Sequence, residues 1–202
     1  MEITKYNQLN KYEASSFTIW KGETRDKNGI GNSCIFEGSQ LNTTLKELNE
    51  NYIFIALNPS NNVVRNDDLS FHNSAYNSKD YKLCYALKGT KYWGSYITDI
   101  FKGYFETDSN MIEDYIKNNP SKVEEDIKIL NEQIGLIKPE RIIVLGNKTY
   151  KYAQEYLNDY KDIMITIPHY SDYSHYGNKD KYRNKVIEIL DKYKKPYEKY
   201  NR

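Results

Sequence analysis

The chain has few of the residues that build metal and redox sites. It contains only two cysteines, Cys34 and Cys84, whereas an iron–sulfur cluster held entirely by thiolates needs about four. The three histidines, at positions 72, 169 and 175, match no compact zinc-ligand spacing. We therefore expect two reduced cysteines and neither an iron–sulfur cluster nor a zinc site.

The chain also lacks an excess of charge and any long apolar run. Lysine and arginine number 29, and aspartate and glutamate 28, so the formal net charge is +1. Bulk charge therefore gives no support for nucleic-acid binding. No run approaches the roughly 18 apolar residues of a membrane helix, and the N-terminal segment has no signal-peptide core. We expect a cytoplasmic protein with no membrane partner.

Four apolar runs rich in β-branched residues predict buried strands. They span residues 52–57, 95–101, 141–145 and 163–167. Helical patterns accompany them at residues 74–87, 121–137, 147–157 and 178–193. Ser121 and Glu124 have the spacing of a capping box at the start of a helix.

This alternation of strands and helices predicts an α/β fold. We expect a single-domain, three-layer α/β/α sandwich around a central, mainly parallel four-stranded sheet. The domain would span residues 1–202, with a core at 50–193 and an N-terminal extension of uncertain structure at 1–50. Within that extension, residues 16–20 and 33–38 suggest a hairpin, and residues 44–50 a short helix.

Polar loops follow all four predicted strands. They read "NPSNN", "KGYFE", "GNKTY" and "PHYSDYSHYG" in chain order. In a parallel sheet, ligands bind outside the carboxyl ends of the strands. The sequence therefore predicts a site at this edge, and Gly146 in the third loop is expected to allow close packing there.

Two of these loops resemble motifs of the uracil-DNA glycosylase superfamily. "ALNPS" (56–60) closes the first strand and is similar to the family's Asn-Pro motif. "HYSDYSHYG" (169–177) follows the fourth strand and resembles its His-x-Ser-x-x-Ser loop. "YITDIFK" (96–102) and "VLGNKTYKYA" (144–153) resemble the segments between them. The Asn-Pro form and the Thr-Asp pair make the mismatch-specific branch the nearest. The resemblance covers about residues 50–190 and implies a glycosylase-like fold.

The resemblance also implies an activity that needs no metal and no organic cofactor, and a set of site residues. A DNA glycosylase of this kind hydrolyses the bond between the sugar and a uracil, mismatched or modified base, in single-stranded DNA or in a flipped nucleotide. Asn58 would position the attacking water, and His169 would stabilise the leaving base. The base itself would contact Pro59, Phe71 and Asp99. The DNA backbone would contact Ser60, Ser171, Tyr173, Ser174 and His175.

Each key residue also has a simpler structural interpretation. Asn58 before a proline is typical of a turn, and His169 resembles a loop histidine satisfied by the backbone. Phe71 resembles a core side chain. Asp99 lies where some branches of the superfamily carry an asparagine that reads the base edge. An ionised carboxylate only accepts hydrogen bonds, so in a pocket it would favour an edge rich in N–H donors, and elsewhere it would be structural.

A second hypothesis is a binding module without turnover, which would hold a free nucleotide, a nucleotide-derived signal or a protein partner. The near-zero net charge favours it, and so do the 21 tyrosines, whose rings can stack on a base. Basic residues gather at 178–185 and near the C-terminus, but such runs are more often a solvated face. A structural protein with no active pocket is a third interpretation.

Overall fold

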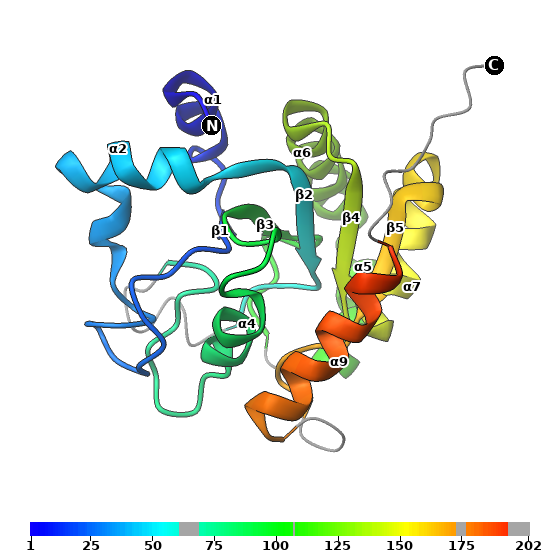
Figure 1. Cartoon of the computed structure of the whole chain (residues 1–202). Helices are drawn as coiled ribbons and strands as arrows, with labels where there is room; N and C mark the ends of the chain where they lie inside the picture. Colours follow the sequence, from blue (N-terminus) through cyan, green and yellow to red (C-terminus); the bar gives the residue numbers. More distant parts are fainter. Residues whose placement is uncertain (61–68, 107, 173–176, 194–202) are drawn as a thin grey trace.

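The structure, a computed structural model, describes residues 1–60, 69–106, 108–172 and 177–193 (Figure 1). Its centre is a five-stranded sheet with the strand order β1-β3-β2-β4-β5. The strands are β1 (Ser15–Phe17), β2 (Asn49–Ala56), β3 (Ser95–Asp99), β4 (Arg141–Leu145) and β5 (Met164–Ile167). All neighbouring pairs are parallel except β1 with β3, which is antiparallel. The α/β class and the mainly parallel sheet are therefore confirmed.

The sheet has one strand more than the four predicted, because the N-terminal region supplies an edge. The predicted hairpin is wrong: Ser16 pairs with Ile97 of β3, and Ser33–Phe36 is a 3-10 helix (η1). Phe17 is 2% exposed, because its ring packs against the rings of Tyr96 in β3 and Tyr6 in the N-terminal helix. Apolar burial at the edge of β3 thus outweighs the local preference for a hairpin.

Helices cover both faces of the sheet. The α-helices are α1 (Ile3–Leu9), α2 (Gly38–Glu47), α4 (Asp80–Leu87), α5 (Ile112–Asn118), α6 (Pro120–Ile137), α7 (Asn147–Tyr156) and α9 (Lys179–Lys192). Two short 3-10 helices are η2 (Ser109–Met111) and η3 (Asn158–Ile163). In Figure 1, α4 and α9 lie in front of the sheet, and α6 and α7 lie behind it.

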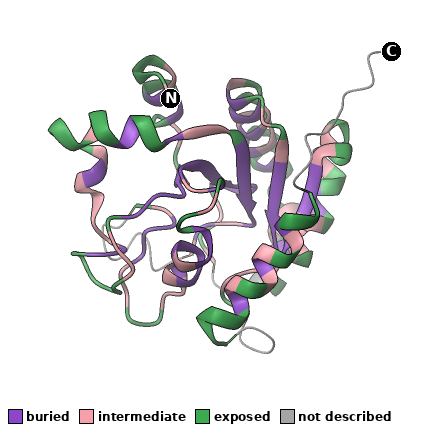
Figure 2. Ribbon diagram, viewed as in Figure 1, coloured by how far each residue is buried: buried purple, intermediate pink, exposed green. Residues whose placement is uncertain are grey.

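Successive side chains of β2 point to opposite faces of the sheet, and this shows why two helical layers are needed. Ile53 and Ile55 belong to the apolar core shared with α1, α6 and α7. Phe54 and Ala56 belong to a second core shared with α4 and α9. Because both faces of this central strand are apolar, both must be covered. Figure 2 shows the result, a buried sheet between helices whose outer faces are exposed.

Two predicted helix starts differ from the observed ones. The helix predicted at 74–87 begins only at Asp80, because residues 73–79 form a loop that the Asp80 side chain closes by accepting from the Asn73 N–H (2.8 Å). The capping box is also wrong. Helix α6 has Asn119 as its N-cap and Pro120 in the first turn, where a missing N–H costs nothing.

Within the part of the chain that the structure describes, no helix is both long and apolar enough to cross a membrane.

Candidate active site

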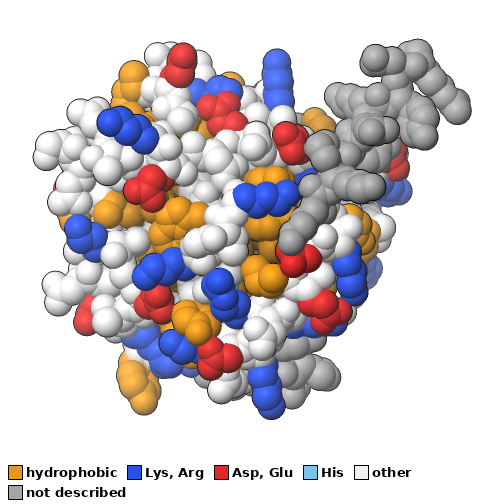
Figure 3. All heavy atoms as spheres, in the orientation of Figure 1, with side chains coloured by type: hydrophobic (Ala, Val, Ile, Leu, Met, Phe, Trp, Pro, Cys, Tyr) orange, Lys and Arg blue, Asp and Glu red, His pale blue; other side chains and the backbone are white. Residues whose placement is uncertain are grey.

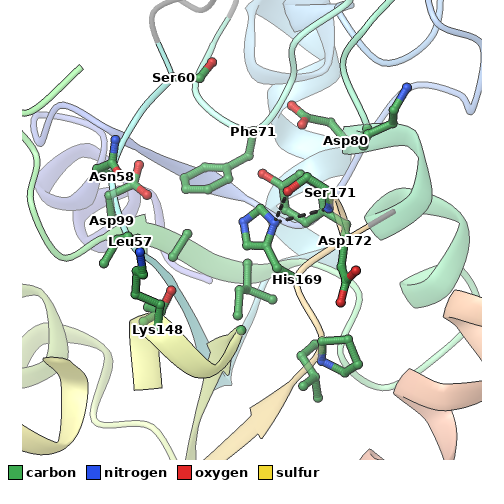
Figure 4. Close-up of a pocket in the computed structure, with 18 of the residues that line it drawn as sticks. Leu57, Asn58, Ser60, Phe71, Asp80, Asp99, Lys148, His169, Ser171 and Asp172 are labelled. Carbon is green, nitrogen blue, oxygen red and sulfur yellow. Dashed lines mark hydrogen bonds between the residues drawn. The ribbon is translucent and has the colours of Figure 1, made fainter. Parts of the chain in front are cut away.

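The carboxyl ends of β2, β3, β4 and β5 open into one cavity of about 810 Å³ (Figure 4). The structure brings together seven of the predicted site residues in its lining: Asn58, Pro59, Ser60, Phe71, Asp99, His169 and Ser171. The other three, Tyr173, Ser174 and His175, lie outside the described residues. The strand-end loops thus converge as the parallel topology requires.

Asn58 follows β2, and its side chain has a fixed orientation. Nδ2 lies 3.0 Å from the carbonyl oxygen of Pro59, 3.1 Å from that of Tyr104 and 2.7 Å from that of Glu106. Carbonyl oxygens only accept, so the NH₂ group of the amide must face them. The amide oxygen Oδ1 is therefore directed away from these carbonyls and left to accept from a donor elsewhere. Asn58 does more than form a turn.

His169 follows β5 and is held as a hydrogen-bond donor. Its Nδ1 accepts the backbone N–H of Ser171 at 3.2 Å and lies 2.7 Å from the Ser171 hydroxyl (Figure 4). Burial lowers the pKa of the imidazole to about 4, although the Asp172 carboxylate opposes that shift. The ring is therefore neutral at pH 7, and because Nδ1 accepts, Nε2 carries the proton.

Gly146 permits the close approach of the His169 loop. It ends β4 with φ +90°, a conformation that side chains rarely adopt. A Cβ added at this position would lie 3.2 Å from the Cβ of His169. The close packing expected at Gly146 is thus present, and its partner is the loop after β5.

Phe71 fits both interpretations that the sequence left open. Its side chain is 6% exposed and belongs to the core in front of the sheet. It also borders the cavity, where Figure 4 shows its ring beside His169. The backbone is unusual for a residue with a side chain, at φ +65°, and its carbonyl accepts from the Trp20 indole at 3.0 Å. Backbone strain of this kind is common where a side chain must be held against a ligand.

Asp99 ends β3 and is almost completely buried, with 1% exposure. The pKa of its carboxyl group is raised, mainly by burial. The Lys102 ammonium group opposes this shift, and the Asp80 carboxylate adds to it. Lys102 itself donates to the Thr98 hydroxyl and to the backbone oxygen of Asp99, both at 2.6 Å. Burial lowers the pKa of Lys102.

Asp80 and Tyr170 also line the cavity, and the sequence interpretation missed both of them. The Tyr170 hydroxyl donates to the Asp80 carboxylate, and burial raises the pKa of this phenol well above its usual value. The Tyr170 ring stacks on the His169 ring, with the centroids 4.4 Å apart. Tyr170 could have been found as the immediate neighbour of His169. Asp80 gave no such signal, because it lies in a segment expected to be continuous helix.

Comparison with known proteins gives one family. The sequence model described as "Uracil DNA glycosylase superfamily" matches residues 34–191, most of the chain. The matched span contains all four strand ends that line the cavity. No match was found among the curated proteins.

Proposed function

The chain belongs to the uracil-DNA glycosylase superfamily, and from that premise we propose that it hydrolyses the N-glycosidic bond of a uracil, mismatched or modified base in DNA. One observation carries the proposal. Asn58 and His169 lie far apart in the sequence, yet they line one cavity with complementary hydrogen-bonding atoms. The amide contributes an acceptor, and the neutral imidazole contributes a donor.

The reaction needs both of these groups. As the bond between C1′ and the base nitrogen breaks, its electron pair leaves with the base, so the sugar becomes positive and the base negative. Water adds to C1′, and its proton neutralises the departed base. In this proposal Asn58 Oδ1 accepts one water hydrogen and directs the water oxygen toward C1′. The N–H at Nε2 of His169 donates to the base oxygen on which negative charge develops.

Phe71 and the strand-end loops would hold the flipped nucleotide. The Phe71 ring would stack on the base and exclude water, and Pro59 would contact the base beside it. The hydroxyls of Ser60 and Ser171 would meet backbone phosphates. For Tyr173, Ser174 and His175, which lie outside the described residues, contact with the DNA backbone stays a prediction.

DNA binding would rest on local contacts, because the formal net charge of the chain is only +1. On the face shown in Figure 3, basic and acidic side chains are interspersed. The basic run at 178–185 is partly structural: the Arg183 guanidinium donates to backbone carbonyls at the end of α4, including that of Ala86 at 3.0 Å. We therefore expect single-stranded or flipped substrates to be held mainly at the cavity.

Base release tests the proposal. Single-stranded and duplex oligonucleotides with one uracil, mismatched thymine or modified cytosine are incubated with the protein, and abasic sites are detected by alkaline cleavage. We expect release by the wild-type chain and a fall of about 10²–10³ in rate for Asn58→Ala and for His169→Ala. Asn184→Ala, on the exposed face of α9, is the control and should match the wild type.

If the folded wild-type protein releases no base from any of these substrates, the proposal is wrong. A rise in melting temperature with a nucleotide, without product, would then favour the non-catalytic binding module.

A further inference from the structure

Three side chains form an acidic wall of the cavity: Asp80, Asp99 and Tyr170. They come from three elements, since Asp80 begins α4, Asp99 ends β3 and Tyr170 follows β5. The two carboxyl groups lie close enough for the charge of Asp80 to raise the pKa of Asp99. Both carboxyl groups also act on the Tyr170 phenol. Figure 4 shows Asp99 beside Asn58, and Asp80 at the start of α4.

The hydrogen bonds of this acidic wall are unevenly distributed. Asp80 accepts from the Asn73 N–H at 2.8 Å and from the Tyr170 hydroxyl. Asp99 is 1% exposed, and among the described residues nothing donates to its Oδ1. Lys102 contacts the Asp99 backbone oxygen and the Thr98 hydroxyl instead. A buried carboxyl oxygen without a donor costs free energy, so a ligand that supplies a donor would be favoured here.

We propose, on the basis of the hydrolase function above, that this cavity selects an amino-bearing pyrimidine of the cytosine class. The amino N–H of the base donates to Asp99, while its ring carbonyl accepts from Nε2–H of His169. Uracil and thymine offer the carbonyl but present a second oxygen in place of the amino group. Adenine offers the amino group but no carbonyl. The cytosine class satisfies both sides of the cavity.

Protonation of Asp99 sharpens this selectivity. A carboxyl group accepts an N–H in either state, but it donates to a carbonyl only when protonated. The groups that face Asp99 are Lys102 after β3, Asp80 on α4 and Tyr170 after β5. Burial raises the pKa of Asp99, so the proton is lost as the pH rises through that higher value. Above it, a uracil oxygen would be repelled, whereas an amino group would still be bound.

The test compares the wild type with Asp99→Asn. This substitution keeps the shape of the side chain, and the amide offers one NH₂ donor group and one oxygen acceptor at any pH. Each enzyme is given single-stranded oligoadenylate with one central cytosine, 5-methylcytosine or uracil, and kcat/KM for base release is measured from pH 6 to 9. Unsubstituted oligoadenylate is the control. For the wild type we expect cytosine-class release to exceed uracil release by at least about tenfold, with a ratio that rises with pH. For Asp99→Asn we expect uracil to be preferred and the ratio to be independent of pH.

Two failures are distinguishable. A wild type that prefers uracil, with a preference that Asp99→Asn leaves unchanged, overturns the selectivity and leaves the hydrolase function standing. Release of no base by either protein overturns the hydrolase function and this inference with it. If Asp99→Asn fails to fold, the change in melting temperature of the wild type with added nucleotide tests the selectivity instead. At pH 8, deoxycytidine monophosphate must stabilise it more than deoxyuridine monophosphate, and the reverse order overturns the inference.

Discussion

At the residue scale, backbone groups fix what each candidate catalytic side chain can do. Three backbone carbonyls accept hydrogen bonds from the Asn58 amide NH₂ group. The Ser171 N–H donates to Nδ1 of His169. Each side chain is left with one defined atom, an acceptor on Asn58 and a donor on His169. Fixed groups of this kind act without reorganising during the reaction, and this lowers the barrier.

His169 should titrate far below the usual range for histidine. Burial lowers its pKa to about 4 in the folded protein, whereas an unfolded histidine titrates near 6.5. As the pH falls, the unfolded chain binds this proton before the folded chain does. The free energy of unfolding therefore decreases as the pH drops from about 6.5 to about 4, and His169 has no such effect above pH 6.5. A proton NMR titration, with the signal assigned by comparison with His169→Asn, checks the midpoint. A midpoint near 6.5 would contradict the half-buried, neutral ring.

Asn58→Asp should destabilise the fold as well as the reaction. The substitution removes the N–H donor and turns a carboxyl oxygen toward the carbonyls of Tyr104 and Glu106. We expect a loss of about 1–3 kcal/mol in the free energy of unfolding, measured by urea denaturation at pH 7. Asn184→Asp makes the same chemical change on an exposed helix face and should shift stability by less than about 0.5 kcal/mol. Equal losses in the two variants would show that the amide orientation is not important.

At the element scale, the junctions between strands and loops position the site. The strands themselves were predictable, because runs such as Arg141–Leu145 are apolar throughout and end at polar loops. The start of α4 was not predictable, because the sequence pattern predicted helix at residues 74–79 as well. The loop depends on Asp80 bonding back to Asn73. A helical pattern shows that apolar positions recur, but it does not show where a side chain caps the helix.

Gly146→Ala tests the junction between β4 and the His169 loop. An alanine here would have a strained backbone at φ +90° and a Cβ 3.2 Å from that of His169. We expect a loss of about 1–3 kcal/mol in stability, and a fall of about 10²-fold in kcat/KM as His169 is displaced.

Gly135→Ala is the matched control for that variant. Gly135 lies within α6, and nothing lies within 4 Å of an added Cβ. This substitution should stabilise the protein by about 0.5–1 kcal/mol and leave activity unchanged. If both variants behave alike, the close approach at Gly146 does not matter for the site.

At the scale of the whole molecule, the N-terminal residues are part of the sheet. β1 pairs with β3, and Tyr6, Leu9 and Phe17 pack in the core that lies against α6. The sequence left residues 1–50 uncertain, because β1 is only three residues long and carries no alternating pattern. Such a short strand is stable only through its neighbours.

Phe17→Ala should therefore weaken the whole chain and not only its first segment. The side chain is 2% exposed, so its truncation should cost about 3–5 kcal/mol and lower the midpoint of a single unfolding transition. Circular dichroism and tryptophan fluorescence should report the same midpoint. Tyr76→Ala, at a side chain that is 89% exposed, should change stability by less than about 0.5 kcal/mol. Two separate transitions would contradict the prediction of one domain.

The sequence by itself determined the parallel strands, most of the helices and the order of the strand-end loops. These features arise from local periodicity and from polar residues at the ends of apolar runs. Tertiary structure alone decided that Asn58 and His169 share a cavity, which way the Asn58 amide faces, and that Asp80 and Tyr170 meet beside Asp99. Those relations depend on contacts between segments distant along the chain, and no local pattern specifies which segments become neighbours when the sheet assembles.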